Sequence, residues 1–219
     1  MAGKLARLFG AQDMTVGSPV TRLVEFSIPL LIGNLAQQLY NTVDSIVVGQ
    51  YVGDEALAAV GASGPILNLL LVLFIGISVG AGIMVSQYFG AKQRELLSNT
   101  VGTVITLTLL SSVFIMIVGP LLTRPMMSML STPDAIFEMA CTYMNIVFIG
   151  IAGNAFYNIL SGVLRGLGDS TMPLVFLLLA CGLNIVLDIL FVAQFHWGVA
   201  GVAIATIIAQ TISAVCCLV

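Results

Sequence analysis

The chain has 219 residues, of which 59% are hydrophobic and only 8% are charged, and its net charge is −3. A soluble domain carries about 25% charged residues, so this composition excludes a water-soluble globular protein and predicts a membrane protein. The seven Lys and Arg residues form no basic face, which excludes nucleic acid as a partner.

The chain begins with a short segment, residues 1–22, that lacks the contiguous apolar core of a signal peptide. Six apolar segments follow over residues 23–219, each near or above the roughly 20 residues that a spanning helix needs. The alternation of a lipid-facing barrel strand is absent. The sequence therefore predicts an all-α integral membrane protein, a six-transmembrane-helix bundle. The expected spans cover residues 23–48, 57–88, 101–122, 136–164, 173–193 and 199–219.

The basic residues predict the orientation, because cytoplasmic loops are enriched in Lys and Arg. Six of the seven flank one side of the expected bundle, and only Arg124 lies on the other. Both termini are therefore expected in the cytoplasm, in a multi-pass protein of the plasma (inner) membrane. The six residues on the cytoplasmic side are Lys4, Arg7, Arg22, Lys92, Arg94 and Arg165.

The cysteines and glycines indicate packing within the bundle. The four cysteines lie in apolar runs and have no metal-ligand spacing with His196, the only histidine, so they read as small hydrophobic residues. The spacing Gly76-x-x-x-Gly80 in the second span predicts close helix packing. Neither pattern indicates a cofactor or a catalytic centre.

Four of the expected spans carry polar stripes at helical spacing, which must face protein or water rather than lipid. A single amide in such a position usually forms a hydrogen bond to a neighbouring helix and stabilises the packing of the two. Four aligned stripes that include two acids favour a hydrated internal cavity instead. The stripes are Asn34, Gln37, Gln38, Asn41, Asp44 and Ser45; Asn154, Asn158 and Ser161; Asn184 and Asp188; and Thr206, Gln210 and Ser213.

Asp44 and Asp188 are the two acids of these stripes, and no Lys, Arg or His lies in the central part of any expected span. An ion pair with a basic residue is therefore unavailable to them there. A buried carboxylate in this position is protonated, hydrated or bound to a cation. A group whose charge depends on an exchangeable ion is what coupled transport requires.

Three stretches resemble the multidrug and toxic compound extrusion transporters, in the same order along the chain. They are "IPLLIGNLAQQLYNTVDSIVVGQYVGDEALAAVG", "SQYFGAKQ" and "GVLRGLGDSTMPL", and the resemblance runs from Met14 onward. It implies a twelve-span protein of two six-span lobes, of which this chain is the N-terminal lobe. The apolar ending "AVCCLV" agrees with a fragment, whose partner is a C-terminal six-helix lobe of the same polypeptide.

The resemblance also implies a site and an activity. A first-span acid and a fifth-span Asn-x-x-x-Asp pair form a cation site in that family, and they match Asp44, Asn184 and Asp188 here. Asn158 and Thr206 resemble further members, and Gln37 is a weaker candidate. The implied activity, without enzyme chemistry or cofactor, is export of drugs or organic cations through alternating access. The implied coupling ion is H+ or Na+, and Na+ would bind at Asp44 and Asp188.

Three other readings stay open. A lipid-linked precursor flippase of the same superfamily would be expected to have a cationic cavity, whereas an acidic, amide-lined one is expected here. An intramembrane aspartyl protease would use the pattern Gly166-x-Gly168-Asp169. That pattern reads better as a turn, with Asp169 capping the next helix, and the partner Tyr-Asp is absent because Asn41 follows Tyr40. A structural membrane module without transport activity is the third.

Overall fold

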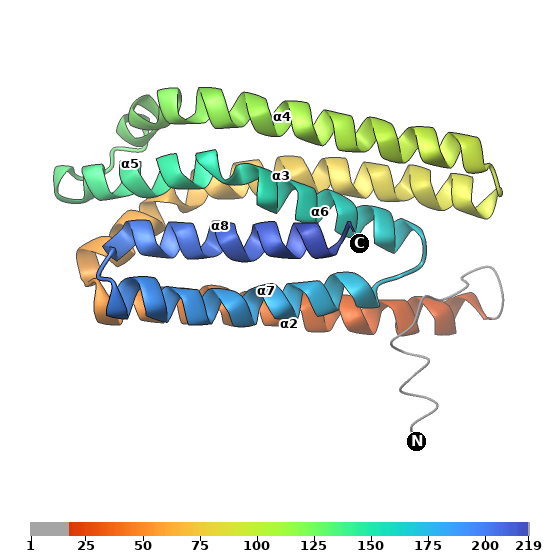
Figure 1. The fold of residues 1–219 in the computed structure, drawn as a ribbon, viewed down its shortest axis with the longest axis horizontal. Coiled ribbons are helices and arrows are strands. Elements are labelled where there is room, and N and C mark those ends of the chain that lie inside the picture. The colour runs from red at the N-terminus through yellow and green to blue at the C-terminus, as the bar shows by residue number, and fades with distance from the viewer. Residues whose placement is uncertain (1–17, 219) are drawn as a thin grey trace, which may run out of the picture.

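The protein is a bundle of long helices (Figure 1). The structure, a computed structural model, describes residues 18–218. Most of the expected N-terminal segment, 1–22, lies outside these residues and stays a prediction. The described part contains α2 (Pro19–Tyr51), α3 (Asp54–Gly90), α4 (Arg94–Met129), α5 (Asp134–Ile149), α6 (Ile151–Gly166), α7 (Thr171–Asp188), the π-helical turn η1 (Ile189–Gln194) and α8 (Gly198–Cys216).

The helices have the lengths and composition of membrane spans. In residues 18–218, α3, α4, α7 with η1, and α8 are each long and apolar enough to cross a membrane, and α5 with α6 would form a fifth span, bent by 51°. The 33 residues of α2 reach about 50 Å. The polar stripe of α2 makes its mean hydropathy lower than that of these spans. The predicted all-helical membrane bundle is confirmed.

The packing order of the helices differs from their order in the chain. α6 lies between α3 and α8, α8 packs on α7, and α7 packs on α2, while α4 covers α3, α5 and α6 on the other side (Figure 1). Direct contacts between α2 and α3 are few. α2 and α3 therefore leave room between them, and the candidate site lies there.

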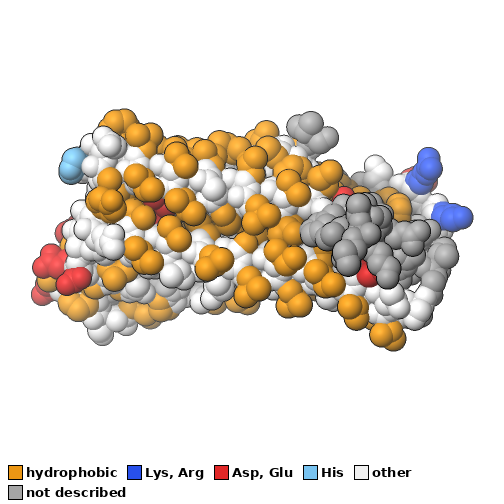
Figure 2. Space-filling model, turned by 90° about the horizontal axis from the view of Figure 1, so that it is seen from below, with side chains coloured by type: hydrophobic (Ala, Val, Ile, Leu, Met, Phe, Trp, Pro, Cys, Tyr) orange, Lys and Arg blue, Asp and Glu red, His pale blue; other side chains and the backbone are white. Residues whose placement is uncertain are grey.

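The outer surface is apolar between two polar ends. Side chains such as Leu35 and Leu39 of α2 and Leu69 of α3 are about two-thirds exposed. Figure 2 shows hydrophobic side chains spread over the length of one face, with acidic side chains at one end and basic ones at the other. A surface of this kind fits the hydrocarbon region of a bilayer, with the charged ends in the headgroup layers.

The expected fourth span, 136–164, is two helices that meet at Gly150. A Cβ at Gly150 would collide with the side chain of Ile207 on α8. The glycine therefore lets α8 approach the bend, and the change of direction between α5 and α6 occurs at this contact. The sequence did not predict the break.

The Gly76-x-x-x-Gly80 packing prediction is wrong for the described residues. A Cβ built at either glycine meets nothing within 4 Å. The close approach in α3 occurs instead at Gly82, whose Cβ would lie 2.9 Å from the carbonyl oxygen of Gly162. Gly162 and Gly166 of α6 face the same stretch of α3, so the backbones of α3 and α6 touch at this point.

Candidate functional site

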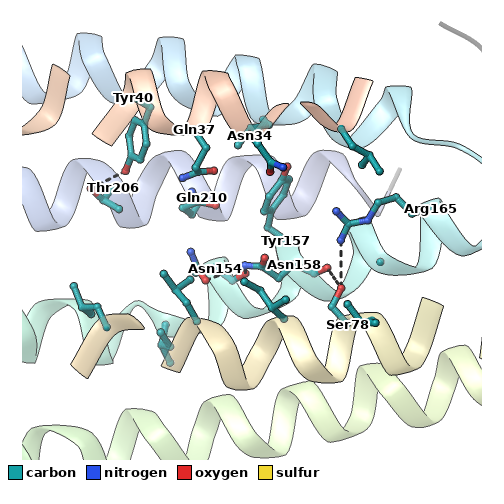
Figure 3. A pocket seen from close by; sticks show the side chains of 18 of the residues that line it. Asn34, Gln37, Tyr40, Ser78, Asn154, Tyr157, Asn158, Arg165, Thr206 and Gln210 are labelled. Carbon is teal, nitrogen blue, oxygen red and sulfur yellow. Dashed lines mark hydrogen bonds between the residues drawn. The ribbon is translucent and has the colours of Figure 1, made fainter. Parts of the chain in front are cut away.

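A cavity of about 800 Å³ lies between α2, α3, α6 and α8, with residues of α5 and α7 completing its wall. Its apolar wall includes Leu71, Ile75 and Leu177. Figure 3 shows the polar side chains of α2, α6 and α8 pointing into it. Polar residues of α3 and α5 also line the cavity. The full polar lining is Asn34, Gln37, Tyr40, Asn41, Asp44, Ser78, Ser86, Tyr143, Asn154, Tyr157, Asn158, Arg165, Thr206 and Gln210.

The structure brings the predicted site residues to one region, in two layers. Asp44, Gln37, Asn158 and Thr206 line the cavity. Asn184 and Asp188 do not line it, because they are buried behind it, with exposed fractions of 1% and 0%. Parts of the predicted stripes on α2, α6 and α8 therefore face the cavity, and the stripe on α7 lies behind it. The stripe residues that do not line it are Gln38, Ser45, Ser161 and Ser213.

Asp44 and Asp188 are the acid pair of the site. Their side chains lie next to each other between α2 and α7. The Oδ1 atom of each has no hydrogen-bond partner among the described residues, and none of the described basic side chains forms an ion pair with either acid.

Asn184 supports Asp188 from the preceding turn of α7. In the orientation that satisfies its amide, Nδ2 donates to Asp188 Oδ2 at 2.7 Å, and Oδ1 accepts from the backbone N–H of Thr206 at 3.2 Å. The Tyr40 hydroxyl donates to Thr206 Oγ1 across a longer 3.4 Å (Figure 3). These bonds connect the acid pair to α8 and fix its position within the bundle.

The sequence reading missed several residues of the site. Tyr40 fits the α2 stripe, because it lies three positions after Gln37 and four before Asp44, so its spacing could have indicated it. Tyr143 lies on the apolar helix α5 and gave no such signal, yet it lines the cavity near both acids. Tyr157 also lines it, and its hydroxyl donates to the carbonyl of Pro173 at 3.0 Å.

Arg165 is the most important of the missed residues. The sequence placed it after the fourth span, but it lies in the last turn of α6, half-buried, and lines the cavity. Its Nη2 donates to Ser78 Oγ at 3.5 Å, and Ser78 Oγ donates to the Asn158 carbonyl at 2.6 Å (Figure 3). Ser78 sits where α3 and α6 touch, so this contact holds it in place.

The cavity consequently has ends of opposite charge, which we name the Asp44 end and the Arg165 end. Asn34 and Asp44 are ten positions apart, about 15 Å along α2, and Arg165 lies beyond Asn34, away from Tyr40 and Thr206 (Figure 3). Between the ends the polar lining consists of amides and hydroxyls. The expectation of an acidic, amide-lined cavity thus holds for the Asp44 end and is wrong for the other.

The Gly166-x-Gly168-Asp169 pattern is a turn between α6 and α7, as the turn reading predicted. Gly168 has a positive φ of 88°, and Asp169 Oδ1 accepts from the backbone N–H groups of Thr171 and Met172 at 2.9 and 3.0 Å. Within residues 18–218, no group of three or more His, Cys, Asp and Glu side chains is placed to hold a metal ion.

The family model described as MatE matches residues 29–190, about three-quarters of the chain. The chain belongs to the MatE family. Among curated MatE relatives, it is 34% identical over 203 residues to "Probable multidrug resistance protein YpnP" of Bacillus subtilis, covering 93% of this chain and 46% of that protein. It is 26% identical to the NorM protein of Thermotoga maritima, covering 88% and 42%.

Solved MatE structures have the same fold as this chain. A MOP superfamily transporter from Pyrococcus furiosus matches with a TM-score of 0.86 and 32% identity, over 91% of this chain and 44% of that one. A MATE protein in a bent conformation matches with a TM-score of 0.85 and 30% identity, over 97% and 46%. The chain therefore spans about half the length of the MatE relatives that it matches.

Proposed function

We infer that the chain is the N-terminal lobe of a secondary active multidrug efflux transporter, which exports cationic and amphiphilic compounds in exchange for H+ or Na+. The observation that carries this proposal is a pair of neighbouring acids, Asp44 at one end of a large cavity and Asp188 buried directly behind it. Relatives of this chain are named multidrug resistance and multidrug export proteins, which supports the same activity.

The acid pair has the chemistry of an ion-coupling site. The described residues place no basic side chain in an ion pair with either acid, so its charge is compensated by a bound proton or by a small cation. Carboxylate, amide and hydroxyl oxygens from Asp44, Asp188, Asn184 and Thr206 are the ligand types that Na+ would need. Because Asp44 also faces the cavity, loading of the pair changes the charge that a cargo molecule meets.

The cavity suits a cationic amphiphile at its Asp44 end. Its wall combines apolar side chains such as Leu71 and Ile75 with the rings of Tyr40 and Tyr143. An aromatic ring attracts an organic cation through its face, and a carboxylate adds the opposite charge. Gln37, Asn158 and Thr206 offer hydrogen bonds that are not tied to one ligand shape. A site of this composition binds many compounds that share charge and hydrophobicity.

Alternating access requires that α2 change its position when the acid pair is loaded. Pro29 lies inside α2 and removes one backbone hydrogen bond, and Gly33 follows one turn later. Bending near these residues would move the cavity-lining stripe relative to α7. Related MATE proteins have been solved in bent and straight conformations. We further propose a cytoplasmic N-terminus in the plasma membrane and a C-terminal six-helix lobe as partner.

A lipid-linked precursor flippase is the second candidate, because Arg165 gives one end of the cavity a positive charge. Efflux of an ethidium-type dye, measured beside flipping of a fluorescent diphosphate lipid, separates the two. A transporter of organic cations moves the dye, and a flippase moves only the lipid.

The experiment is dye efflux from an efflux-deficient bacterial strain that expresses the protein. We expect Asp44→Asn combined with Asp188→Asn to abolish energised efflux at unchanged protein level in the membrane. Glu55→Gln is the matched control, since it removes an exposed acid from the first turn of α3, and it should leave efflux unchanged. Full efflux by the double variant would refute the proposal.

A further inference from the structure

We propose that the Arg165 end of the cavity is an oxyanion subsite, which binds the carboxylate or phosphate of a cargo molecule. This inference rests on the proposed export function. Its basis is a half-buried guanidinium that lines the cavity and is in no ion pair with any described residue.

The hydrogen-bonding capacity of Arg165 is almost unused among residues 18–218. A guanidinium has five N–H donors in a planar fork. Arg165 uses one of them, toward Ser78 Oγ at 3.5 Å, which is long for a hydrogen bond. The Ser78 hydroxyl already donates to Asn158, so Ser78 acts as an acceptor that orients the fork. Four donors remain for a ligand, and carboxylate and phosphate match them in pairs.

Arg124, another arginine that lies near a helix end but with an acid in reach, does have a carboxylate partner. Arg124 is exposed, yet its Nη2 bonds both carboxylate oxygens of Glu138 at 2.8 Å. Arg165 is the more buried of the two and has no such partner in the described chain. Burial of an unpaired charge is unfavourable, and an anion entering the cavity at this end removes that cost.

The acids of the site lie too far away to neutralise Arg165. Asp44 lies about 15 Å along α2 from Asn34, and Arg165 lies beyond Asn34 on the side away from Tyr40 (Figure 3). Asp188 is buried behind the Asp44 end. Gly82 and Gly166, where α3 and α6 touch, also line the cavity. Asn34 and Tyr157 line the same end and present further polar atoms. An oxyanion there meets a cation and neutral polar groups.

The test is equilibrium binding of two dyes that differ in one group, an ethyl ester in the first and a free carboxylate in the second. Rhodamine 6G is a cationic ester, and rhodamine 19 is the corresponding zwitterionic free acid. Fluorescence anisotropy measures their affinity for the purified protein in phosphatidylcholine nanodiscs. We expect Arg165→Gln to weaken rhodamine 19 about tenfold or more, as loss of a charge-assisted hydrogen-bonding pair does. Rhodamine 6G should bind unchanged, and Arg165→Lys should retain part of the rhodamine 19 affinity.

The other outcomes overturn the proposal. Equal weakening of both dyes, with Arg165→Gln eluting normally on size exclusion, would make Arg165 a structural link between α3 and α6. No change for either dye would show that cargo does not reach it. Phosphatidylglycerol that co-purifies with wild type but not with Arg165→Gln, together with equal affinity of wild type for both dyes, would show that the oxyanion is a lipid headgroup and not cargo. Arg124→Gln is the matched control and should alter neither dye.

Binding does not depend on ion-driven transport, so the two proposals fail separately. Loss of dye discrimination with intact efflux of rhodamine 6G would refute only the oxyanion subsite. Intact discrimination in a protein that exports nothing under an ion gradient would refute only the proposed efflux.

Discussion

Replacement of Gly162 by alanine tests whether the contact between α3 and α6 positions the cavity wall. The new Cβ would collide with Ser78 Oγ and would lie 2.6 Å from the Ser78 carbonyl oxygen. The backbone oxygen cannot rotate away, so the two helices must separate. Ser78 would then lose its hydrogen bonds to Asn158 and Arg165 or move with α3.

The magnitude follows from three contributions. Overpacking costs about 1–3 kcal/mol, and a weakened Ser78–Asn158 hydrogen bond adds about 1 kcal/mol. Alanine gains about 1 kcal/mol over glycine in helix propensity, which offsets part of this. The net destabilisation is about 1–3 kcal/mol, or a melting temperature about 3–10 °C lower for a chain of this size.

The control is Gly80→Ala, on the helix that Gly162 contacts. A Cβ at Gly80 meets nothing within 4 Å, so only the propensity gain applies and the melting temperature should stay equal or rise slightly. Thermal unfolding of both variants in the same detergent gives the comparison. A Gly162→Ala protein as stable as wild type, or a Gly80→Ala protein that loses as much, would refute the packing argument.

Three further substitutions probe the hydrogen bonds around the site. Tyr157→Phe removes the donor to the Pro173 carbonyl and should cost about 1 kcal/mol in thermal unfolding, whereas Tyr51→Phe, at an exposed position, should cost nothing. Asn184→Leu leaves Asp188 without its amide donor and should destabilise the protein by about 2 kcal/mol or more. Asn68→Leu, on the exposed surface of α3, is the control and should leave stability unchanged. Equal destabilisation by both variants would contradict the hydrogen bond between Asn184 and Asp188. Arg124→Gln breaks the exposed pair with Glu138 and should cost under about 1 kcal/mol, an effect that vanishes at high salt.

The helices and their polar faces could be predicted from the sequence because they depend on local periodicity. Asn34, Gln37 and Asp44 recur at helical steps in α2, and the structure places them on one wall of the cavity. A stripe of this kind must avoid lipid wherever the helix packs. The sequence left open whether Asp44 and Asp188 lie near each other, and the structure places their side chains next to each other.

Features that depend on contacts between distant residues could not be predicted in this way. Gly150, at the bend, packs against Ile207, which is 57 positions away in the chain. The Gly76-x-x-x-Gly80 spacing looked like a packing motif, but Gly82 makes the contact, because the register against α6 decides which glycine is used.

Arg165 shows a different limit of the sequence reading. Counting basic residues assigned it to a loop, since charges near span ends usually face the cytoplasm. The helix α6 continues past Arg165 to Gly166, so its side chain projects into the cavity instead. The position of one helix end thus decides whether this charge lies in a loop or lines the cavity.

The most direct test of the central claim, that Asp44 and Asp188 hold the coupling ion, is transport in proteoliposomes under separately imposed pH and Na+ gradients. We predict that one of the two gradients drives rhodamine 6G movement in wild type and that this dependence disappears in Asp44→Asn with Asp188→Asn. The Glu55→Gln control should keep the gradient dependence of wild type. Movement of the dye in the double variant that still follows the same gradient would contradict the account.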